Sequence, residues 1–337
     1  YMLRTAIELA QHDPAYEDQA LCYLDHFIDI AAAMDRMGDN KDDMWDKQDG
    51  FYYDVLRFPD GSGTRLKVRS LVGLLPMCAS SVIDPDELEK LPRLKQRYHA
   101  LVDQKAELTQ NIACPHMAGT GGRRLLAIMD ADKLYRVLTR MLDEDEFLGP
   151  YGIRSLSRYH ADNPYIFYWN DEAYGVSYLP GESDSGMFGG NSNWRGPVWM
   201  PTNFLILRAL VNLYTYYGDD FRIECPTGSG REMTLYEVAV DIACRLAAIF
   251  LRNESGMRPV YGGSDKFQHD PHWRDHILFY EYFHGDNGAG IGASHQTGWT
   301  GMIATMLVLL ASVQPAELID DGVEAAIDAL AEVSEKK

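Results

Sequence analysis

The sequence has 337 residues, of which 31 are Lys or Arg and 50 are Asp or Glu, so the formal net charge is -19. A chain of this length can bury a substantial core, and its 11% aromatic content is too high for a disordered protein. The acidic excess argues against nucleic acid and against anionic membrane surfaces, both of which attract basic proteins. We therefore expect a globular protein whose partner is neutral or cationic, or is bound in a pocket remote from the net charge.

Apolar residues spaced three and four apart predict helices over most of the chain. Long loops rich in Gly, Trp, Tyr and His lie at 38–67, 144–199 and 253–297, with strand-like runs at 51–56 and 165–169. Loops of this length in a compact domain are usually functional. The pattern predicts an all-α toroid of paired helices with a site at one end, and argues against a βαβ fold. The predicted helices are 1–11, 17–37, 68–81, 86–107, 131–143, 200–217, 232–252, 298–313 and 316–334.

The start of the helical pattern, the cysteines and the last apolar run bear on the completeness of the chain, its location in the cell and its relation to membranes. The first helical pattern already runs at Tyr1 without a capping residue before it, so we expect a piece of a longer protein. Five cysteines are spread without a C-x-x-C pair, which predicts reduced thiols and a cytoplasmic location. The apolar run Met302 to Val313 is too short for a membrane span and predicts a buried helix. The pattern does not indicate an oligomeric state.

Two further patterns each have a functional and a structural interpretation. Asp286 to Ala293 contains G-x-G-x-x-A, yet the next carboxylate is Glu317, so a tight glycine loop explains it better than a dinucleotide site. His269, His272 and His276 would share one face of a helix, as metal ligands can. The alternative is a helix start with surface histidines.

Two aromatic segments carry the polar residues that a sugar site needs. Asn193 to Trp199 reads N-W-R-G-P-V-W, and Trp rings stack on the C–H faces of sugars while Arg donates to hydroxyls. The structural alternative is a packed loop with core tryptophans. Phe279 to Phe283 places Glu281 among four aromatic residues, where a carboxylate needs partners and has an adjustable pKa. Glu281 is therefore a catalytic candidate, and the alternative is a structural pair with Arg274.

Together these segments resemble glycoside hydrolase family 63. Asn193 to Trp199 matches the W-R-G-P-x-W motif of that family, and Tyr280 to Thr300 matches its C-terminal pattern with the glycine loop. Trp45 to Asp54 resembles the W-D-x-x-x-G-F-Y-x-D hairpin of related toroid glycosidases. The resemblance covers essentially the whole chain and is strongest to the bacterial, mannosyl-oligosaccharide glucosidase-like branch.

The resemblance implies an (α/α)6 toroid and an inverting α-glycosidase, for which we expect no metal and no cofactor. In such enzymes one carboxylic acid protonates the leaving oxygen, and a second carboxylate deprotonates the attacking water. Glu281 matches the general base, and Trp194, Arg195 and Trp199 match sugar-binding positions. Other positions expected near the sugar are Glu182, Asp184, His295 and Trp299.

The general acid of that family lies in a loop that the resemblance places upstream of Tyr1. Asp46 belongs to the hairpin motif, where we expect a structural role. A complete toroid also needs more helices than the pattern predicts, so residues 1–337 are expected to be the C-terminal part of one catalytic domain, weakly active or inactive alone. The expected substrate is an α-glucoside or a related α-linked oligosaccharide. The alternatives are a non-catalytic carbohydrate-binding toroid and a metalloenzyme that uses the three histidines.

Overall fold

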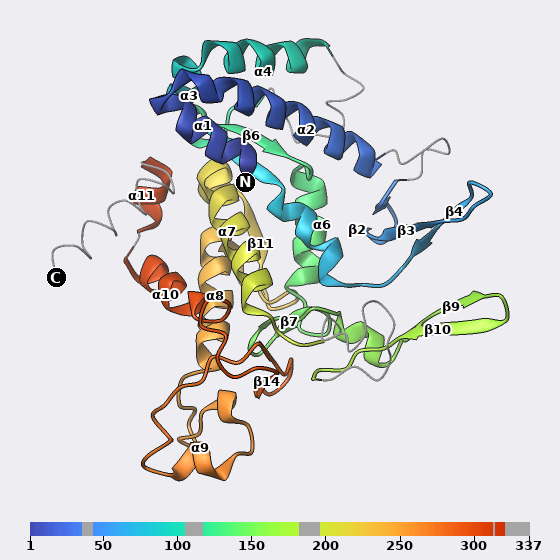
Figure 1. The fold of residues 1–337 in the computed structure, drawn as a ribbon, viewed down its shortest axis with the longest axis vertical. Coiled ribbons are helices and arrows are strands. Elements are labelled where there is room, and N and C mark those ends of the chain that lie inside the picture. Colours follow the sequence, from blue (N-terminus) through green and yellow to red (C-terminus); the bar gives the residue numbers. More distant parts are fainter. Residues whose placement is uncertain (36–42, 105–116, 182–195, 313, 321–337) are drawn as a thin grey trace.

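The computed structural model describes residues 1–35, 43–104, 117–181, 196–312 and 314–320. Within these residues the fold is mainly helical with several small strand pairs (Figure 1). The α-helices are α1 (Met2–His12), α2 (Glu17–Asp35), α3 (Pro85–Lys90), α4 (Pro92–Gln104), α6 (Ala131–Met141), α7 (Met200–Tyr217), α8 (Leu235–Ala248), α9 (Asp265–His269), α10 (Met302–Ser312) and α11 (Pro315–Asp320). The strands are β1 (Trp45–Asp46), β2 (Phe51–Tyr52), β3 (Asp54–Arg57), β4 (Gly63–Leu66), β5 (Ser80–Ile83), β6 (Arg124–Ala127), β7 (Leu148–Gly149), β8 (Gly152–Ile153), β9 (Tyr165–Trp169), β10 (Glu172–Val176), β11 (Arg222–Glu224), β12 (Glu232–Thr234), β13 (Tyr282–Phe283) and β14 (Gly290–Ile291).

Helices α1, α2 and α4 form a layer at the top of Figure 1. Glu17, at the start of α2, is buried, and its Oε1 accepts the backbone N–H groups of Arg93 (2.8 Å) and Leu94 (3.0 Å). These N–H groups lie in the first turn of α4, where they lack partners within the helix. The carboxylate therefore ties α2 to α4. The buried positions of α1 follow the predicted helical spacing: Leu3, Ala6, Ile7 and Ala10.

The helix pair α7 and α8 forms the centre of the fold, with α10 packed against both and α11 against α7 (Figure 1). α7 begins after Trp199, has Pro201 in its first turn, and ends at Gly218, whose φ is +61°. α8 begins with a capping box, in which Thr234 Oγ1 accepts the N–H of Glu237 (3.2 Å) and the Glu237 carboxylate accepts the N–H of Thr234 (2.7 Å). The α7–α8 pair therefore anchors the segment that ends at Trp199, immediately before α7.

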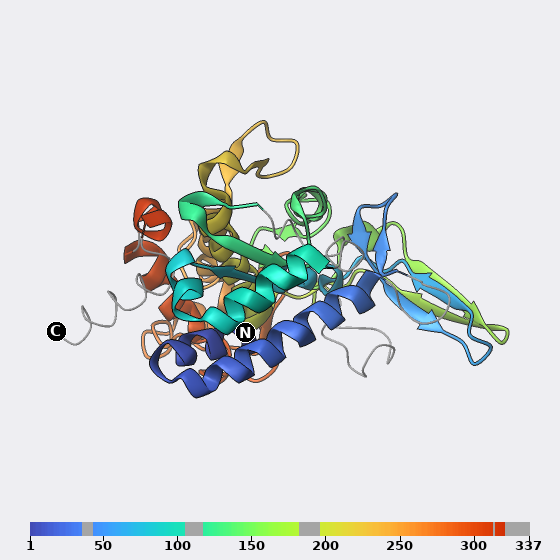
Figure 2. The same ribbon diagram turned by 90° about the horizontal axis from the view of Figure 1, so that it is seen from above.

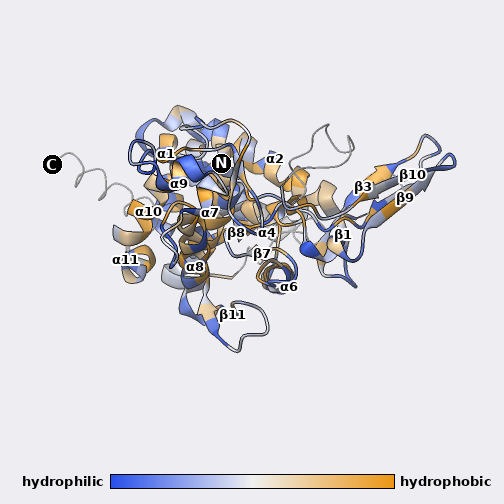
Figure 3. Cartoon of the chain, turned by 90° about the horizontal axis from the view of Figure 1, so that it is seen from below, coloured by the Kyte–Doolittle hydropathy of each residue, from blue (hydrophilic) through white to orange (hydrophobic). Residues whose placement is uncertain are grey.

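The strands of the described residues form seven two-stranded antiparallel sheets. Two of these hairpins, β3–β4 and β9–β10, project side by side from the helices, as Figures 1 and 2 both show. In β9–β10 the turn residues Asn170 and Asp171 have φ values of 49° and 63°, which suits a tight hairpin. Both hairpins carry apolar as well as polar residues (Figure 3). The strand predicted at 165–169 is confirmed.

The helix predicted over 68–81 is wrong. The segment forms two 3-10 turns, Leu71–Gly73 and Leu75–Cys78, and then enters β5. A Cβ on Gly73 would lie 2.4 Å from the carbonyl oxygen of Tyr52, so the chain passes β2 at close range. The apolar residues of this segment are spaced as in a helix because one side of the irregular chain is buried.

Two other predicted helices are shorter than expected. The run 86–107 is divided into α3 and α4 at Pro92, which begins the second helix. The run 232–252 starts as β12 and becomes helical only at Leu235. The helix predicted at 316–334 is described only as far as residue 320. The helix expected at 200–217 is confirmed with the same bounds, and those expected at 1–11, 17–37, 131–143 and 298–313 are confirmed as helices within the described residues, with other ends.

The apolar run near the C-terminus forms α10, which is only half-buried. Ile303 is 5% exposed, whereas Val308 on the other face is 57% exposed. The prediction of a helix is confirmed, but its full burial is not seen. No helix within the described ranges combines the length and the apolar character that a membrane crossing requires.

Candidate active site

A ladder of short backbone pairings brings the Glu281 segment to the start of α7. Val198 pairs with Arg154 on one side and with Phe283 on the other. Val198 and Phe283 exchange N–H···O bonds of 2.8 and 2.9 Å. β13 then pairs with β14. The described end of the first aromatic segment, residues 196–199, therefore lies beside the second aromatic segment, residues 279–283.

The Glu281 side chain is partly buried and lies against the glycine loop. Its Oε2 atom accepts the backbone N–H of Ala293 at 3.3 Å. Gly292 has a φ of +77°, and a Cβ at this position would lie only 2.7 Å from Glu281 Oε2. Glycine is therefore required for the backbone to approach the carboxylate. The structural interpretation of the glycine motif, a tight loop, is thus the one that the fold supports.

The expected alternative role of Glu281, a pair with Arg274, is not formed. Arg274 Nε lies 3.4 Å from a carboxylate oxygen of Asp275 instead. Among the described residues no ion pair to Glu281 is found. A carboxylate that accepts one backbone N–H keeps lone pairs for a water molecule or a sugar hydroxyl.

Three aromatic rings surround this carboxylate segment. Trp199 stacks on Tyr282 with ring centroids 4.8 Å apart and an interplanar angle of 22°. Trp299 contacts Trp199 edge-on at 6.2 Å and donates its Nε1–H to the backbone carbonyl of Glu281 at 3.1 Å. Trp199 is 4% exposed and Trp299 is 38% exposed. Trp299 therefore offers ring surface to a ligand, whereas Trp199 positions its neighbours.

The other edge of the Glu281 segment is held by residues 295–300. Phe279 pairs with the exposed His295, and the N–H of Gln296 donates to the carbonyl of Phe279 at 2.8 Å. Thr300 is fully buried, and its hydroxyl donates to the carbonyl of Tyr280. The segment that carries the candidate base is thus fixed on both edges.

A polar network at the start of the glycine loop was not predicted. Arg154 is 3% exposed and donates from Nη2 to Asp286 Oδ1 at 3.1 Å, and the hydroxyl of Tyr178 donates to the same oxygen at 2.8 Å. Burial raises the pKa of Tyr178, so its hydroxyl remains a donor at neutral pH. Burial also lowers the pKa of His284, whose Nδ1 lies 3.3 Å from the N–H of Asp286. The network fixes the start of the glycine loop.

Asp46 has the contacts of a structural residue. Its Oδ1 accepts the N–H groups of Gln48 (3.0 Å) and Asp49 (2.9 Å), and its Oδ2 lies 2.8 Å from Lys67 Nζ. Burial raises the pKa of Asp46, but the hydrogen bonds from Lys67 and from the backbone outweigh it and lower the pKa overall. A carboxyl group in this state is a poor proton donor, which supports the structural role expected for it.

Part of the expected sugar site cannot be placed. The described members of the site are Glu281, Trp199, His295 and Trp299. Four expected positions lie outside the described residues: Glu182, Asp184, Trp194 and Arg195.

The three histidines do not form the helical metal site that was one alternative. α9 ends at His269, because Pro271 disfavours helical backbone at the residue before it. His269 Nε2 lies 3.7 Å from Asp265, while His272 and His276 lie in turns beyond the helix. In the part of the chain that the structure describes, no group of three His, Cys, Asp or Glu side chains is arranged to hold a metal ion.

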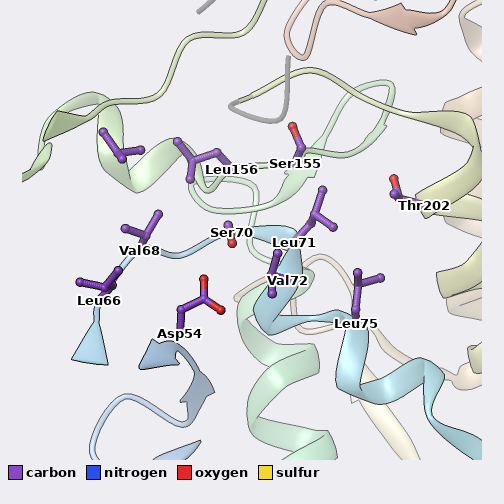
Figure 4. A pocket seen from close by; sticks show the side chains of 11 residues that line it. Asp54, Leu66, Val68, Ser70, Leu71, Val72, Leu75, Ser155, Leu156 and Thr202 are labelled. Atoms are coloured by element: carbon purple, nitrogen blue, oxygen red, sulfur yellow. The ribbon is translucent and has the colours of Figure 1, made fainter. Parts of the chain in front are cut away.

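A cavity of about 490 Å³ lies beside the start of α7 (Figure 4). Thr202 lines it, and the Thr202 hydroxyl donates to the carbonyl of Trp199 at 3.1 Å. Ser155, next to Arg154 in the ladder, also lines it, and the carboxylate of Asp54 points into it (Figure 4). We call it the inner cavity. Its size lies within the range of small-molecule sites, roughly 300–1,000 Å³.

Sequence comparisons place this helical domain among the glycoside hydrolases. The profile of the mannosylglycerate hydrolase MGH1-like glycoside hydrolase domain matches residues 124–300, more than half of the chain. The chain belongs to this family. The matched region contains Glu281, Trp199 and the buried Arg154 network.

Three yeast proteins are similar to the chain. It is 46% identical over 317 residues to the uncharacterized protein YMR196W of Saccharomyces cerevisiae, covering 90% of the chain and 29% of that protein. It is 24% identical over 179 residues to the mannosyl-oligosaccharide glucosidase of Saccharomyces cerevisiae, covering 53% of the chain and 15% of the relative. The probable mannosyl-oligosaccharide glucosidase of Schizosaccharomyces pombe is 25% identical over 187 residues, 54% of the chain and 16% of the relative. The predicted resemblance to mannosyl-oligosaccharide glucosidases is confirmed, over about half of the chain, and the chain spans less than a third of each of these proteins.

Proposed function

We propose that the chain carries the general-base part of an inverting α-glycoside hydrolase, with Glu281 as the base. One observation carries the proposal: the Glu281 carboxylate is held by the N–H of Ala293 and has no ion pair within the described ranges, while the backbone carbonyl of Glu281 accepts the Nε1–H of the partly exposed Trp299. A fixed carboxylate with free lone pairs, on a residue bonded to a partly exposed tryptophan, suits a water that attacks a bound sugar.

In the proposed reaction Glu281 takes a proton from a water molecule as the water oxygen bonds to the anomeric carbon. The bond from that carbon to the leaving oxygen breaks at the same time, and a second carboxylic acid protonates the leaving oxygen. The attack comes from the face opposite the leaving group, so the configuration at the anomeric carbon inverts. Each proton returns through solvent after the product leaves.

We infer that the general acid lies in another part of the full-length protein. Asp46 is engaged by Lys67 and by backbone N–H groups, so it is not proposed for this role. The helices described here would then form part of an (α/α)6 toroid, and the remaining helices would come from the same longer polypeptide. Trp194 and Arg195, with Glu182 and Asp184, are proposed to contact the sugar.

The proposed substrate is an α-glucoside or an α-linked oligosaccharide. Two relatives carry the name mannosyl-oligosaccharide glucosidase, and the family is named after a mannosylglycerate hydrolase, so the related names all refer to cleavage of sugar derivatives.

The test is hydrolysis of aryl α-glucosides and α-linked oligosaccharides by the full-length protein, followed by proton NMR of the anomeric signal. We expect turnover in which the β-anomer is formed first. An α-anomer formed first would contradict the inverting mechanism. Sugar binding without turnover would favour a non-catalytic carbohydrate-binding domain.

A further inference from the structure

The two projecting hairpins enclose a groove between them. Side chains alternate along a strand, so Asp54, Leu56 and Phe58 share one face of the first hairpin. On the second hairpin Phe167 and Trp169 share one face of β9. These faces enclose a cavity of about 500 Å³, which we call the hairpin groove. Its lining residues are Leu56, Phe58, Pro59, Leu66, Tyr165, Phe167, Trp169 and Tyr174.

The hairpin groove is rich in accessible aromatic surface. Phe58 and Trp169 stack at its outer end with centroids 4.7 Å apart and an interplanar angle of 15°, and Trp169 remains 44% exposed. At its edge the Tyr174 hydroxyl donates to the Glu172 carboxylate at 2.5 Å. Aromatic rings with polar groups beside them suit ligands that have both C–H faces and hydroxyls, as sugars do. A contiguous apolar patch of this kind usually marks a binding site.

The hairpin groove adjoins the inner cavity. Leu66 lines both, so they share a wall. The inner cavity reaches Thr202, whose hydroxyl is bonded to the carbonyl of Trp199. Trp199 in turn stacks on Tyr282, the residue after Glu281. The two cavities therefore adjoin each other, and the inner cavity reaches a residue bonded to Trp199, which packs against the Glu281 segment.

A carboxylate lies in the inner cavity, across the hairpin from Leu66, the residue that lines both cavities. Asp54 pairs with Leu66 across β3–β4, and its side chain points into the inner cavity (Figure 4). Among the described residues it has no hydrogen-bond or ion-pair partner, and burial raises its pKa. Ser70, Ser155 and Thr202 add hydroxyls to the wall, and the lining residues other than these and Asp54 are aliphatic. Asp54 is thus an acceptor available to the hydroxyl groups of a neutral ligand.

We propose that the hairpin groove and the inner cavity form one binding track for sugar units of a linear α-linked oligosaccharide, at a distance from the bond cleaved at Glu281. The strand from Asp54 to Phe58 spans about 13 Å, which is longer than one sugar ring. Rings in the hairpin groove stack on C–H faces, and Asp54 accepts a hydroxyl. The proposal rests on the proposed function, because the orientation of the oligosaccharide is defined by the bond that Glu281 would help to cleave. Its test measures binding alone.

The experiment is calorimetric titration of the full-length protein carrying Glu281→Gln with α-linked glucose and mannose oligosaccharides of increasing length. We expect the Kd to fall with chain length. Trp169→Ala should weaken binding of the longest oligosaccharide about tenfold, and Trp169→Phe should retain most of the affinity because a ring remains. The matched control is Tyr168→Ala, which removes a ring that is 70% exposed on the opposite face of β9 and should leave the Kd unchanged.

Several results would overturn the track. One is an affinity that does not depend on chain length, and another is an equal loss in Trp169→Ala and Tyr168→Ala. A third is a lower thermal midpoint for Trp169→Ala with unchanged affinity, because another part of the protein would then cover the hairpin groove. Length-dependent binding without hydrolysis of any α-glucoside would refute the proposed function and leave the track standing. Hydrolysis without length-dependent binding would refute the binding track and leave the proposed function standing.

Discussion

Substitution of Gly292 by alanine is expected to disturb Glu281 more than it disturbs the fold. Gly292 has a φ of +77°, and an added Cβ would lie 2.7 Å from Glu281 Oε2 and 2.9 Å from the ring of Tyr282. Ordinary contact begins at 3.4 Å, so the carboxylate must move away or the loop must open. The N–H of Ala293, which now donates to the carboxylate, would move with the loop.

The size of the effect follows from two separate costs. A non-glycine residue in left-handed backbone costs roughly 1–2 kcal/mol of folding free energy. A displacement on the order of 1 Å at a catalytic group costs about 10²-fold in rate. We therefore expect Gly292→Ala to lower kcat by roughly 10–100-fold while the protein loses only a modest part of its stability.

The matched control is Gly256→Ala, because Gly256 has a φ of +74° and nothing within 4 Å of an added Cβ. It carries the same backbone cost without the clash. The assay is kcat on an aryl α-glucoside with the full-length protein, together with urea unfolding of both variants. Equal kcat values for Gly292→Ala and Gly256→Ala would refute the view that the glycine loop positions Glu281.

Two further predictions concern the polar contacts behind the site. Glu146 is buried between Arg69 and Arg140, so Glu146→Ala should lower the free energy of unfolding by about 3–5 kcal/mol. The control is Glu89→Ala, which removes one partner of an exposed ion pair and should change the free energy of unfolding little. Similar urea midpoints for the two variants would contradict this prediction. Burial lowers the pKa of His160, and its Nε2 accepts the N–H of Arg69 at 2.9 Å, which requires the neutral ring. The unfolded chain then binds the proton more readily, so stability should fall as the pH falls below the ordinary value of 6.5, and His160→Gln should reduce this pH dependence. An unchanged slope of thermal midpoint against pH in the variant would count against it.

The local motifs were predictable because they depend on adjacent residues. Residues 200–217 form α7 as expected, since the periodicity, Pro201 and Gly218 all agree. Glu281 was identified because a carboxylate among aromatic residues is unusual. The glycine loop beside it was also expected, and Gly292 shows why glycine is needed there.

The tertiary features were not predictable from these patterns. The network of Arg154, Tyr178 and Asp286 joins three segments that are far apart in the sequence, and each residue is unremarkable in its own segment. The prediction of a helix over 68–81 was wrong because apolar spacing indicates which side chains are buried but does not determine the backbone conformation. The pairing of the two hairpins, which creates the hairpin groove, depends on the same kind of long-range contact.

The central claim is that Glu281 acts as the general base, and kcat of Glu281→Gln in the full-length protein tests it most directly. The amide keeps the size of the side chain but cannot accept the proton of the attacking water. The account predicts a fall in kcat of roughly 10²–10⁴-fold on an α-glucoside, with an unchanged thermal midpoint. A variant that folds normally and hydrolyses the substrate at the wild-type rate would contradict it.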